Sequence, residues 1–319
     1  MSHTVYIDGH AGTTGLRIRD WLAGRDDIDL VILPDELRKD SDARREAVQG
    51  ADIAVLCLPD EAAKEVALWA QDSDVRLIDA STAHRVAPDW VFGLPEMHPS
   101  QRDKIREAKR ISNPGCWSSS TILLVRPLID AGILSPDALL SIHGISGYSG
   151  GGRPLIEKWQ DPDGGLSSLP YPAPYAYGWK HKHIPEMQRY CGLVNEPQFI
   201  PSVGAYKCGM RIQVPLHKGQ LNGASAAQIQ DAYEERYRDE PFVVLHEPGA
   251  GEPYDEMSFD PRVCNDTNRI ELRVLAHPDG HVTLMAVLDN LGKGASGMAI
   301  QSLNILTGAD ETTGLPVRL

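Results

Sequence analysis

Short apolar runs alternate with amphipathic stretches through the first 110 residues or so. The apolar runs predict strands at 4–8, 29–33, 52–58 and 75–81. The amphipathic stretches predict helices at 12–23, 41–49 and 59–71. Continuous apolar strands that alternate with helices are typical of a parallel sheet covered on both faces. The first part of the chain is therefore predicted to be a Rossmann-like α/β domain.

The pattern changes after about residue 116. Apolar and polar residues alternate in strand-like runs at 209–217, 269–277 and 281–289, and a further strand is predicted at 139–146. Helices are predicted at 118–132 and 225–239, and residues 160–180 predict a long loop rich in Pro, Gly and Tyr. This second region predicts an α+β domain with a mixed or antiparallel sheet. A last apolar helix, at 294–308, could dock on the first domain.

The motif "IDGHAGTTG" joins the first predicted strand to its helix, with Gly9, Gly12 and Gly15 in a GxxGxxG spacing. Such glycines allow a tight turn and a close approach of the backbone to a pyrophosphate, and the helix N-terminus favours an anion. Thr13 and Thr14 add hydroxyls for phosphate oxygens. The position of this glycine motif directly after the first predicted strand favours a dinucleotide-binding loop over a turn that is glycine-rich only because it packs tightly.

Residues at the end of the second strand give mixed indications of the cofactor. Asp35 and Glu36 would suit the ribose diol of NAD, whereas Arg38 and Lys39 would suit the 2′-phosphate of NADP. Alternatively, Arg38 and Lys39 could simply be solvent-exposed residues at the start of a helix. The balance favours NADP(H).

Length and charge narrow the class of protein. A chain of 319 residues is long enough for two domains. Its net charge of −13 argues against a nucleic-acid or anionic-membrane partner. No apolar run approaches the roughly 20 residues that cross a bilayer, and the start does not have the pattern of a secretory leader. We therefore expect a cytoplasmic protein.

The five cysteines are odd in number and contain no CxxC pair, which argues against a disulfide framework or a cysteine-rich zinc site. Cys116 differs from the others because it follows "SNPG" and begins a predicted helix. Backbone N–H groups at a helix start favour the reactive thiolate. The same groups, with Asn113 or the serines after Cys116, could hold an oxyanion. The alternative is a small buried residue at a turn, as Cys57 is expected to be.

A thiolate nucleophile needs a partner that transfers protons. The segment "WKHKHIPEMQ" offers His181 and His183 ahead of a predicted helix, and histidine is the usual acid or base near neutral pH. The pair could instead bind a metal, but no third ligand matches. Glu186 could orient an imidazole or cap the helix.

Two loop arginines are candidates for binding an anion. Arg85 lies in "DASTAHR" and Arg153 follows "SGYSGGG", and both come after predicted strands. Either could be an ordinary surface charge, yet two arginines beside serine or glycine runs favour binding of phosphate or carboxylate.

A dinucleotide loop, an activated cysteine and a histidine together suit reductive acyl transfer through a thioester.

Six segments in order make the chain resemble the type 2 N-acetyl-gamma-glutamyl-phosphate reductases of arginine biosynthesis, within the aspartate-semialdehyde dehydrogenase superfamily. These segments are "DGHAGTTG", "LIDASTAHR", "SNPGCWSSS", "HGISGYSGGGR", "HKHIPEM" and "DNLGKGASGMAIQ". The resemblance covers nearly the whole chain. It implies NADPH-dependent reduction of N-acetyl-gamma-glutamyl phosphate to the semialdehyde with release of phosphate. It also implies a small-molecule substrate, a homo-oligomer (dimer or tetramer) and no metal.

The resemblance assigns roles to single residues. It makes Cys116 the nucleophile and His183 the acid or base, and it places Asn290 near the nicotinamide. It places Ser146, Gly147 and Arg153 on the substrate side, and Arg85 near the substrate phosphate or the nicotinamide. With the motifs above, the residues expected to bind the substrate are Asn113, Ser146, Gly147, Arg153, Arg85 and Glu186. The residues expected to bind the cofactor are Gly9, Gly12, Thr13, Thr14, Gly15, Arg38, Lys39, Ser81 and Asn290. It further implies a cofactor domain at 1–115 and 292–319, and a catalytic domain at 116–291.

The sequence departs from the longer family members where Trp117 and Ser118 follow the cysteine in place of Tyr and Pro or Thr. The loop after His143 also carries Tyr148 and a third consecutive glycine. A homologous acyl phosphate, aspartyl or aminoadipyl, therefore stays open as the substrate. So do two other classes of function, a metal-dependent hydrolase using the histidine pair and a non-catalytic nucleotide sensor.

Overall fold

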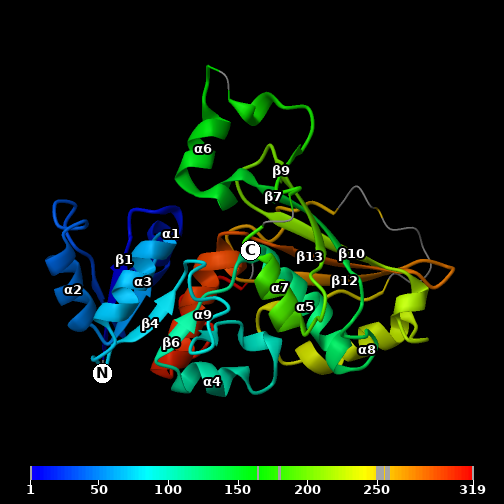
Figure 1. Cartoon of the computed structure of the whole chain (residues 1–319), viewed down its shortest axis with the longest axis horizontal. Helices are drawn as coiled ribbons and strands as arrows, with labels where there is room; N and C mark the ends of the chain where they lie inside the picture. The colour runs from blue at the N-terminus through cyan, green and yellow to red at the C-terminus, as the bar shows by residue number, and fades with distance from the viewer. Residues whose placement is uncertain (1, 164, 179–180, 249–254, 256–258, 318–319) are drawn as a thin grey trace. The chain divides into compact units, whose positions relative to one another are not determined.

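The structure is a computed structural model that describes residues 2–163, 165–178, 181–248, 255 and 259–317 (Figure 1). The chain divides into two compact units. Unit 1 comprises Met1–Pro114 and Ala295–Leu315, and unit 2 comprises Gly115–Gly294 and the chain from Pro316 onward.

Unit 1 is built on a parallel six-stranded sheet in the order β2-β1-β3-β4-β6-β5. Its strands are β1 (His3–Asp8), β2 (Ile28–Val31), β3 (Ile53–Leu56), β4 (Arg76–Asp79), β5 (Val91–Phe92) and β6 (Arg110–Ser112). Its helices are α1 (Thr13–Leu22), α2 (Ser41–Gln49), α3 (Asp60–Trp69), α4 (Gln101–Glu107) and α9 (Gly297–Thr307). The predicted Rossmann-like fold is confirmed, although the pattern did not predict β5, β6 or α4.

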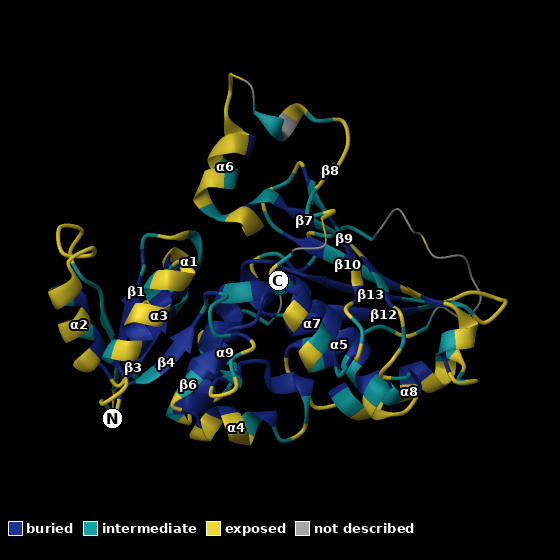
Figure 2. Ribbon diagram, in the orientation of Figure 1, coloured by how far each residue is buried: buried dark blue, intermediate teal, exposed yellow. Residues whose placement is uncertain are grey.

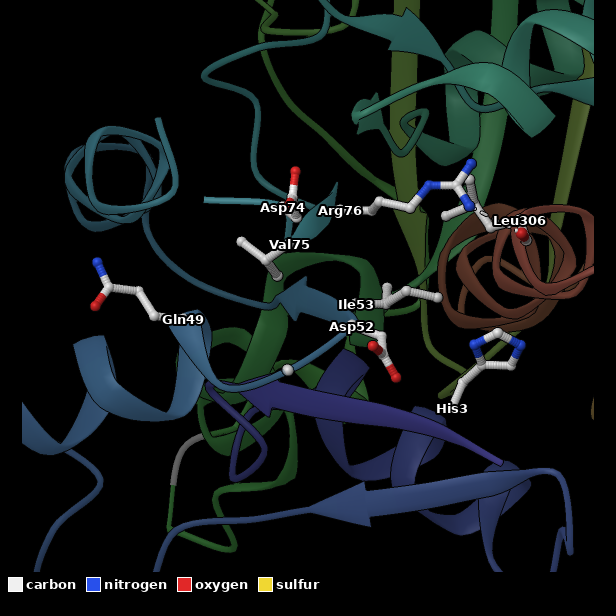
Figure 3. Close-up of a pocket in the computed structure, with 9 residues that line it drawn as sticks. His3, Gln49, Asp52, Ile53, Asp74, Val75, Arg76 and Leu306 are labelled. Carbon is white, nitrogen blue, oxygen red and sulfur yellow. Dashed lines mark hydrogen bonds between the residues drawn. The ribbon is translucent and has the colours of Figure 1, made fainter. Parts of the chain in front are cut away.

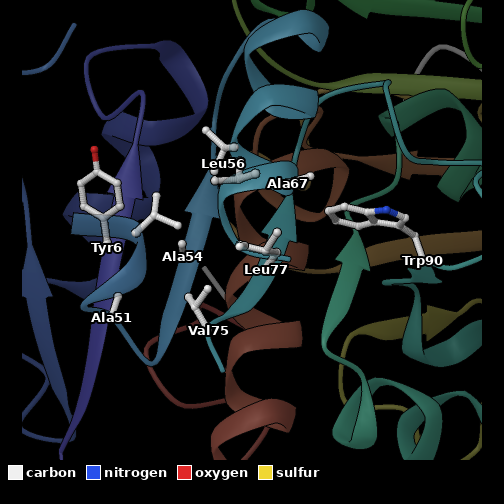
Figure 4. Close-up of a cluster of buried hydrophobic side chains, with 11 residues drawn as sticks. Tyr6, Ala51, Ala54, Leu56, Ala67, Val75, Leu77 and Trp90 are labelled. Carbon is white, nitrogen blue, oxygen red and sulfur yellow. The ribbon is translucent and has the colours of Figure 1, made fainter. Parts of the chain in front are cut away.

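The core of unit 1 follows from its apolar strands. All four residues of β3 are buried, and Ala54 and Leu56 pack with Tyr6 of β1 and Leu77 of β4 (Figure 4). The strand order reverses between β1 and β3, the point at which open parallel sheets bind ligands beyond the carboxyl ends of their strands. Helix α9 is buried almost throughout and contacts α1, α4 and β4 (Figure 2).

Unit 2 contains a mixed seven-stranded sheet in the order β11-β12-β13-β10-β7-β9-β8. Its strands are β7 (Ser141–Gly147), β8 (Ala173–Pro174), β9 (Gln198–Gly204), β10 (Met210–Leu216), β11 (Val243–Leu245), β12 (Ile270–Ala276) and β13 (Val282–Leu288). The sheet is mixed because β7 pairs with β9, and β11 with β12, in parallel. The sequence had left the choice between a mixed and an antiparallel sheet open.

The helices of unit 2 are α5 (Cys116–Asp130), α6 (Gly152–Gln160), α7 (Ile184–Cys191) and α8 (Ala226–Tyr237). Helix α5 packs on β10, β13, α7 and α8, so it is the central helix over the sheet (Figure 1). In β10, Met210, Ile212 and Val214 are buried while Arg211 and Gln213 are half-buried, which is the alternation that the sequence showed. Strand β9 and helix α6 were not predicted.

No helix in the described part of the chain is both long and apolar enough to span a bilayer.

Candidate functional site

The glycine loop of unit 1 lies where β1 ends and α1 begins. Gly9 has φ +85°, and a Cβ there would lie 2.3 Å from the backbone oxygen of Cys57 at the end of β3. A Cβ at Gly15 would lie 2.6 Å from the oxygen of Gly9. Gly12 is the N-cap of α1, and no side chain caps it. The loop therefore excludes side chains at Gly9 and Gly15, and no side chain caps the start of its helix, as binding of a pyrophosphate requires.

The turn after β2 contains the residues that bear on the choice of cofactor. Arg38 and Lys39 are exposed, and Nε of Arg38 lies 3.6 Å from Oδ1 of Asp35. Nε2 of His10, in the glycine loop, lies 3.9 Å from the same oxygen. Arg38 and Lys39 therefore lie in the turn after β2, on the same side of unit 1 as His10 of the glycine loop.

The loop after β4 is organised by the buried carboxylate of Asp79. It accepts hydrogen bonds from the backbone N–H of Ser81 (2.9 Å) and from the Ser81 hydroxyl (2.7 Å). Its other contact is Nδ1 of His84 at 2.6 Å, and the His84 ring stacks on Trp90. Arg85 is buried and donates to the carbonyl of Ala80. Ser81 and Arg85 are thus held rigidly at the carboxyl edge of the sheet.

Asn113 lies just after β6, at the same edge, and is buried. Its Nδ2 donates to the carbonyl of Ala295 at 3.0 Å. Its Oδ1 has no hydrogen-bond partner within the described residues. A buried acceptor left unsatisfied costs roughly 1–3 kcal/mol, and a bound donor would remove that cost. The tight glycine loop is the feature of unit 1 that fits a nicotinamide dinucleotide, and the Asn113 acceptor is open to a donor from a bound molecule.

In unit 2, Cys116 is the first residue of α5, as the sequence predicted. The three serines that follow are buried. Ser119 Oγ donates to the carbonyl of Gly115, and Ser120 Oγ donates to that of Cys116. The N–H groups of the first turn, in contrast, have no acceptor within the helix. They are the better candidates for binding an oxyanion, because the serine hydroxyls already donate within the helix.

Glu186 connects the two catalytic candidates. Its buried carboxylate accepts from the backbone N–H of Gly115 at 3.0 Å and from Ser118 Oγ at 2.6 Å. Helix α7, which carries Glu186, begins directly after His183. His183 is buried, and its backbone N–H donates to Nδ1 of His181. The turn that bears the histidine is therefore bonded to the residue that precedes the cysteine.

The alternative of a metal site has no third ligand in the part of the chain that the structure describes. No group of three or more His, Cys, Asp or Glu residues there could hold a metal ion. Nδ1 of His181 accepts a backbone N–H, and its ring meets that of His183 edge to face at 4.7 Å.

Another group of candidate residues in unit 2 lies where β7 ends, β10 begins and β13 ends. Met210 pairs with Ser146 on one side and with Leu288 on the other. Asn290, just beyond β13, accepts from the N–H of Gly209 (2.9 Å) and donates to Ser149 Oγ (2.9 Å). Ser146 and Gly147 therefore belong to this group together with Asn290, whose side chain is engaged inside unit 2.

Arg153 lies apart from this buried group. It belongs to α6, its side chain is 78% exposed, and it pairs with Glu157 at 2.8 Å across one helical turn. Gly294, in contrast, lies directly against Cys116, since a Cβ there would be 2.7 Å from Cβ of Cys116. No role was predicted for Gly294, although it belongs to the motif "DNLGKGAS".

The other cysteines do not have the setting of Cys116. Burial raises the pKa of the Cys57 thiol and of the Cys264 thiol to about 12, and it raises the pKa of Cys191 as well. These three thiols stay protonated and unreactive at neutral pH.

A pocket of about 300 Å³ opens at the amino end of the unit 1 sheet (Figure 3). His3, Asp52, Asp74 and Arg76 are among its lining residues. The guanidinium of Arg76 donates to the carbonyls of Ala108 and Leu306, and so binds the carboxyl ends of α4 and α9. This pocket lies at the opposite end of the strands from the glycine loop.

Two family models match the chain. One, described as "Semialdehyde dehydrogenase, NAD binding domain", matches residues 5–106, and the other, "Semialdehyde dehydrogenase, dimerisation domain", matches residues 116–290. The chain is 44% identical to N-acetyl-gamma-glutamyl-phosphate reductase 2 of Pseudomonas putida, over 97% of this chain and 98% of that protein. It is 43% identical to N-acetyl-gamma-glutamyl-phosphate reductase of Trichormus variabilis, over 98% of each.

Solved structures show the same fold. Aspartate semialdehyde dehydrogenase II of Vibrio cholerae superposes with a TM-score of 0.72 at 17% identity, covering 97% of this chain and 99% of that one. The aspartate semialdehyde dehydrogenase of Francisella tularensis gives a TM-score of 0.70 at 14% identity, covering 96% and 100%.

Proposed function

This chain belongs to the N-acetyl-gamma-glutamyl-phosphate reductases of the semialdehyde dehydrogenase family, and we propose that it reduces N-acetyl-gamma-glutamyl phosphate to N-acetylglutamate 5-semialdehyde and phosphate, in arginine biosynthesis. The family predicted from the sequence motifs is confirmed. The observation that carries the proposal is the hydrogen bond from the N–H of Gly115 to the carboxylate of Glu186. This bond joins the residue before Cys116 to the helix that begins directly after His183.

The first step is acyl transfer to the cysteine. The Cys116 thiolate attacks the carbonyl carbon of the acyl phosphate, a C–S bond forms, and the carbonyl electrons move onto oxygen. N–H groups of the first turn of α5 hold that oxyanion. The electrons then return, the C–O bond to phosphate breaks, and His183 gives its proton to the departing phosphate. The product is a thioester on Cys116.

The hydride that reduces this thioester is the chemistry that bound NADPH supplies. Cys116 then leaves as a thiolate when the thiohemiacetal collapses to the aldehyde, and His183 regains a proton from solvent. One acyl phosphate, one hydride and one proton thus give one aldehyde and one phosphate.

Residues of unit 1 would hold the cofactor. Gly9, Gly12 and Gly15, with Thr13 and Thr14, suit the pyrophosphate, because their loop leaves no room for a side chain at Gly9 or Gly15. Arg38 and Lys39 suit the 2′-phosphate of NADP(H). Ser81 follows β4, at the same carboxyl edge of the sheet as the glycine loop, and Asn290 of unit 2 is assigned to the nicotinamide.

The substrate side would combine buried and exposed groups. Ser146, Gly147 and Glu186 are buried in unit 2, and the exposed Arg153 offers a cation for the substrate's carboxylate or phosphate. Asn113 and Arg85 are assigned to the substrate from unit 1.

A homo-oligomer and a cytoplasmic location belong to the same proposal. The family model for residues 116–290 is a dimerisation domain. In support, one face of β10 carries Arg211, Gln213 and Pro215, which are half-buried or exposed beside the buried face. NADPH-dependent biosynthesis suits the cytoplasm.

The reverse reaction tests the proposal. Wild-type protein is expected to reduce NADP in the presence of N-acetylglutamate semialdehyde and phosphate, and to do so faster than it reduces NAD. Cys116→Ser should lower the rate at least about a thousandfold while the circular dichroism spectrum stays unchanged. Cys264→Ala, which removes a buried thiol of the same unit, is the matched control. A Cys116→Ser variant that keeps a tenth of the activity would rule out covalent catalysis at this residue.

A further inference from the structure

Beside the nucleophile lies a pair of aromatic residues to which no role has been assigned. Trp117 follows Cys116 in the first turn of α5 and is 3% exposed. Its indole Nε1 donates a hydrogen bond of 2.9 Å to the hydroxyl oxygen of Tyr175. Tyr175 belongs to the loop between β8 and α7, some sixty residues away in sequence. The pair therefore joins the nucleophile's helix to the loop that leads to His183.

The Trp117 ring is held in one orientation by the sheet. A Cβ at Gly144 of β7 would lie 2.2 Å from the indole atom Cζ3, so the ring rests directly on the backbone of this strand. Phe199 of β9 meets the indole edge to face at 5.3 Å. With one face on a glycine and Phe199 at its side, the indole cannot rotate without a clash, and its single N–H direction is fixed.

Tyr175 is fixed as well. Its backbone N–H donates to the carbonyl of Pro201 at 3.2 Å, and its ring lies 5.7 Å from that of His181. Burial raises the pKa of the Tyr175 phenol, and a negative charge on Cys116 raises it further. The phenol therefore keeps its proton at neutral pH, and it lies close enough to Cys116 to interact with a charge on the sulfur.

The hydrogen bond from Trp117 determines what the Tyr175 hydroxyl can still donate to. A phenol has one hydrogen to donate, and its oxygen already accepts from Trp117. Among the described residues, the recorded hydrogen bonds of the Tyr175 hydroxyl consist of this one alone. The hydrogen is thus left to donate to a ligand, and the hydroxyl that carries it is bonded to Trp117, the residue next to Cys116.

We propose that the Tyr175 hydroxyl donates a hydrogen bond to the acyl oxygen of the substrate when Cys116 attacks, and that Trp117 is the positioning residue that directs it. This inference rests on the proposed function, since it needs an acyl group on Cys116. As the C–S bond forms, the carbonyl oxygen gains the electron pair, and the Tyr175 hydrogen bond strengthens with that charge. No proton leaves the phenol, so the balance of the reaction is unchanged.

Tyr175→Phe keeps the ring and removes only the hydroxyl. The kcat of the reverse reaction should fall about a hundredfold with KM within about threefold, because the lost bond is strongest in the transition state. The pH midpoint for inactivation of Cys116 by iodoacetamide should not move. Tyr177→Phe, two residues away and 57% exposed, is the matched control and should be indistinguishable from wild type.

Trp117→Phe keeps an aromatic ring against Gly144 and removes the N–H. It should lower kcat about tenfold, and the double variant with Tyr175→Phe should be no slower than Tyr175→Phe alone. Melting temperatures of all variants establish that they are folded, and Trp117→Phe still tests the pair if Tyr175→Phe does not fold.

Two results would overturn the inference. One is a kcat for Tyr175→Phe within threefold of wild type. The other is a rise of its iodoacetamide midpoint by a pH unit, which would mean that the hydroxyl donates to the thiolate and not to the substrate. An inactive wild-type protein would instead refute the proposed function, so the two failures are distinguishable.

Discussion

Two helix N-termini are the proposed sites of cofactor binding and of the cysteine nucleophile, and they are built in opposite ways. The start of α1 in unit 1 is lined by glycines and has no acidic residue in its first turn. The start of α5 in unit 2 also has a glycine N-cap, but the buried carboxylate of Glu186 binds the backbone N–H of that glycine. Both helices have the same dipole, yet only one has an anionic side chain of the protein at its start.

The difference corresponds to what each helix start must hold. A loop that binds a diphosphate needs its N–H groups and its positive potential for the ligand, so a carboxylate there would compete with it. A catalytic cysteine is part of the protein, and it needs a fixed position more than a strong field. The Glu186 carboxylate bonds both Gly115 and Ser118, and so rigidifies the turn that precedes the thiol.

The largest effect is expected from crowding the α1 start. In Gly15→Ala the new Cβ would lie 2.6 Å from the oxygen of Gly9, and relieving such an overlap costs about 1–3 kcal/mol. The dissociation constant for NADP(H) should therefore rise by up to about a hundredfold. Fluorescence titration measures it, and the alkylation rate of Cys116 should stay at its wild-type value.

Gly12→Ala separates crowding from ligand contact in the same loop. A Cβ at Gly12 would be 3.4 Å from its nearest neighbour, the oxygen of Gly9, which is an ordinary contact. The melting temperature should not change, so weaker NADP(H) binding would report contact between this backbone and the pyrophosphate. If Gly12→Ala binds NADP(H) with the affinity of the wild type, the proposed contact between this loop and the pyrophosphate is wrong.

The fold was predictable because its determinants are local. Runs such as "DIAVLCL" are long enough to identify buried strands, and the alternation in "GMRIQVPLH" identifies a half-buried one. Strand β9 escaped prediction because "QFIPSVG" carries a proline and a glycine, which depend on pairing with β7 and β8 for their place in the sheet. The residues of β5, only two in number, form a strand solely through β6.

The site was predictable only in part, for a similar reason. The position of Cys116 at a helix start follows from the turn "NPG" before it. The contact of Glu186 with Gly115 spans 71 residues, and that of Trp117 with Tyr175 spans 58. No local pattern specifies which carboxylate or phenol the fold brings to a helix start. The close approach of Gly294 to Cys116 is likewise visible only in three dimensions.

A smaller effect is expected at the 2′-phosphate of the cofactor. Arg38→Ala removes an exposed guanidinium that has only Asp35 as a recorded ion-pair partner within the described residues. A hydrogen bond to a charged phosphate contributes about 1.5 kcal/mol, so KM for NADP should rise about tenfold while KM for NAD stays within twofold. Steady-state kinetics with both cofactors measure the ratio. An equal loss for both cofactors would contradict a 2′-phosphate contact.

The smallest effect is expected from neutralising the α5 start. Glu186→Gln keeps an oxygen that can accept from Gly115 and removes the negative charge beside the thiol. Because a nearby negative charge disfavours the thiolate, the pH midpoint of Cys116 alkylation should fall by about half a unit, and kcat should change about threefold or less. Glu186→Ala leaves Gly115 and Ser118 without their buried acceptor and should lower the free energy of unfolding by about 1–3 kcal/mol. If Glu186 instead contacts the substrate directly, Glu186→Gln would raise KM and leave the alkylation midpoint in place. The carboxylate at the α5 start would then serve to bind the substrate and not to hold the turn before Cys116.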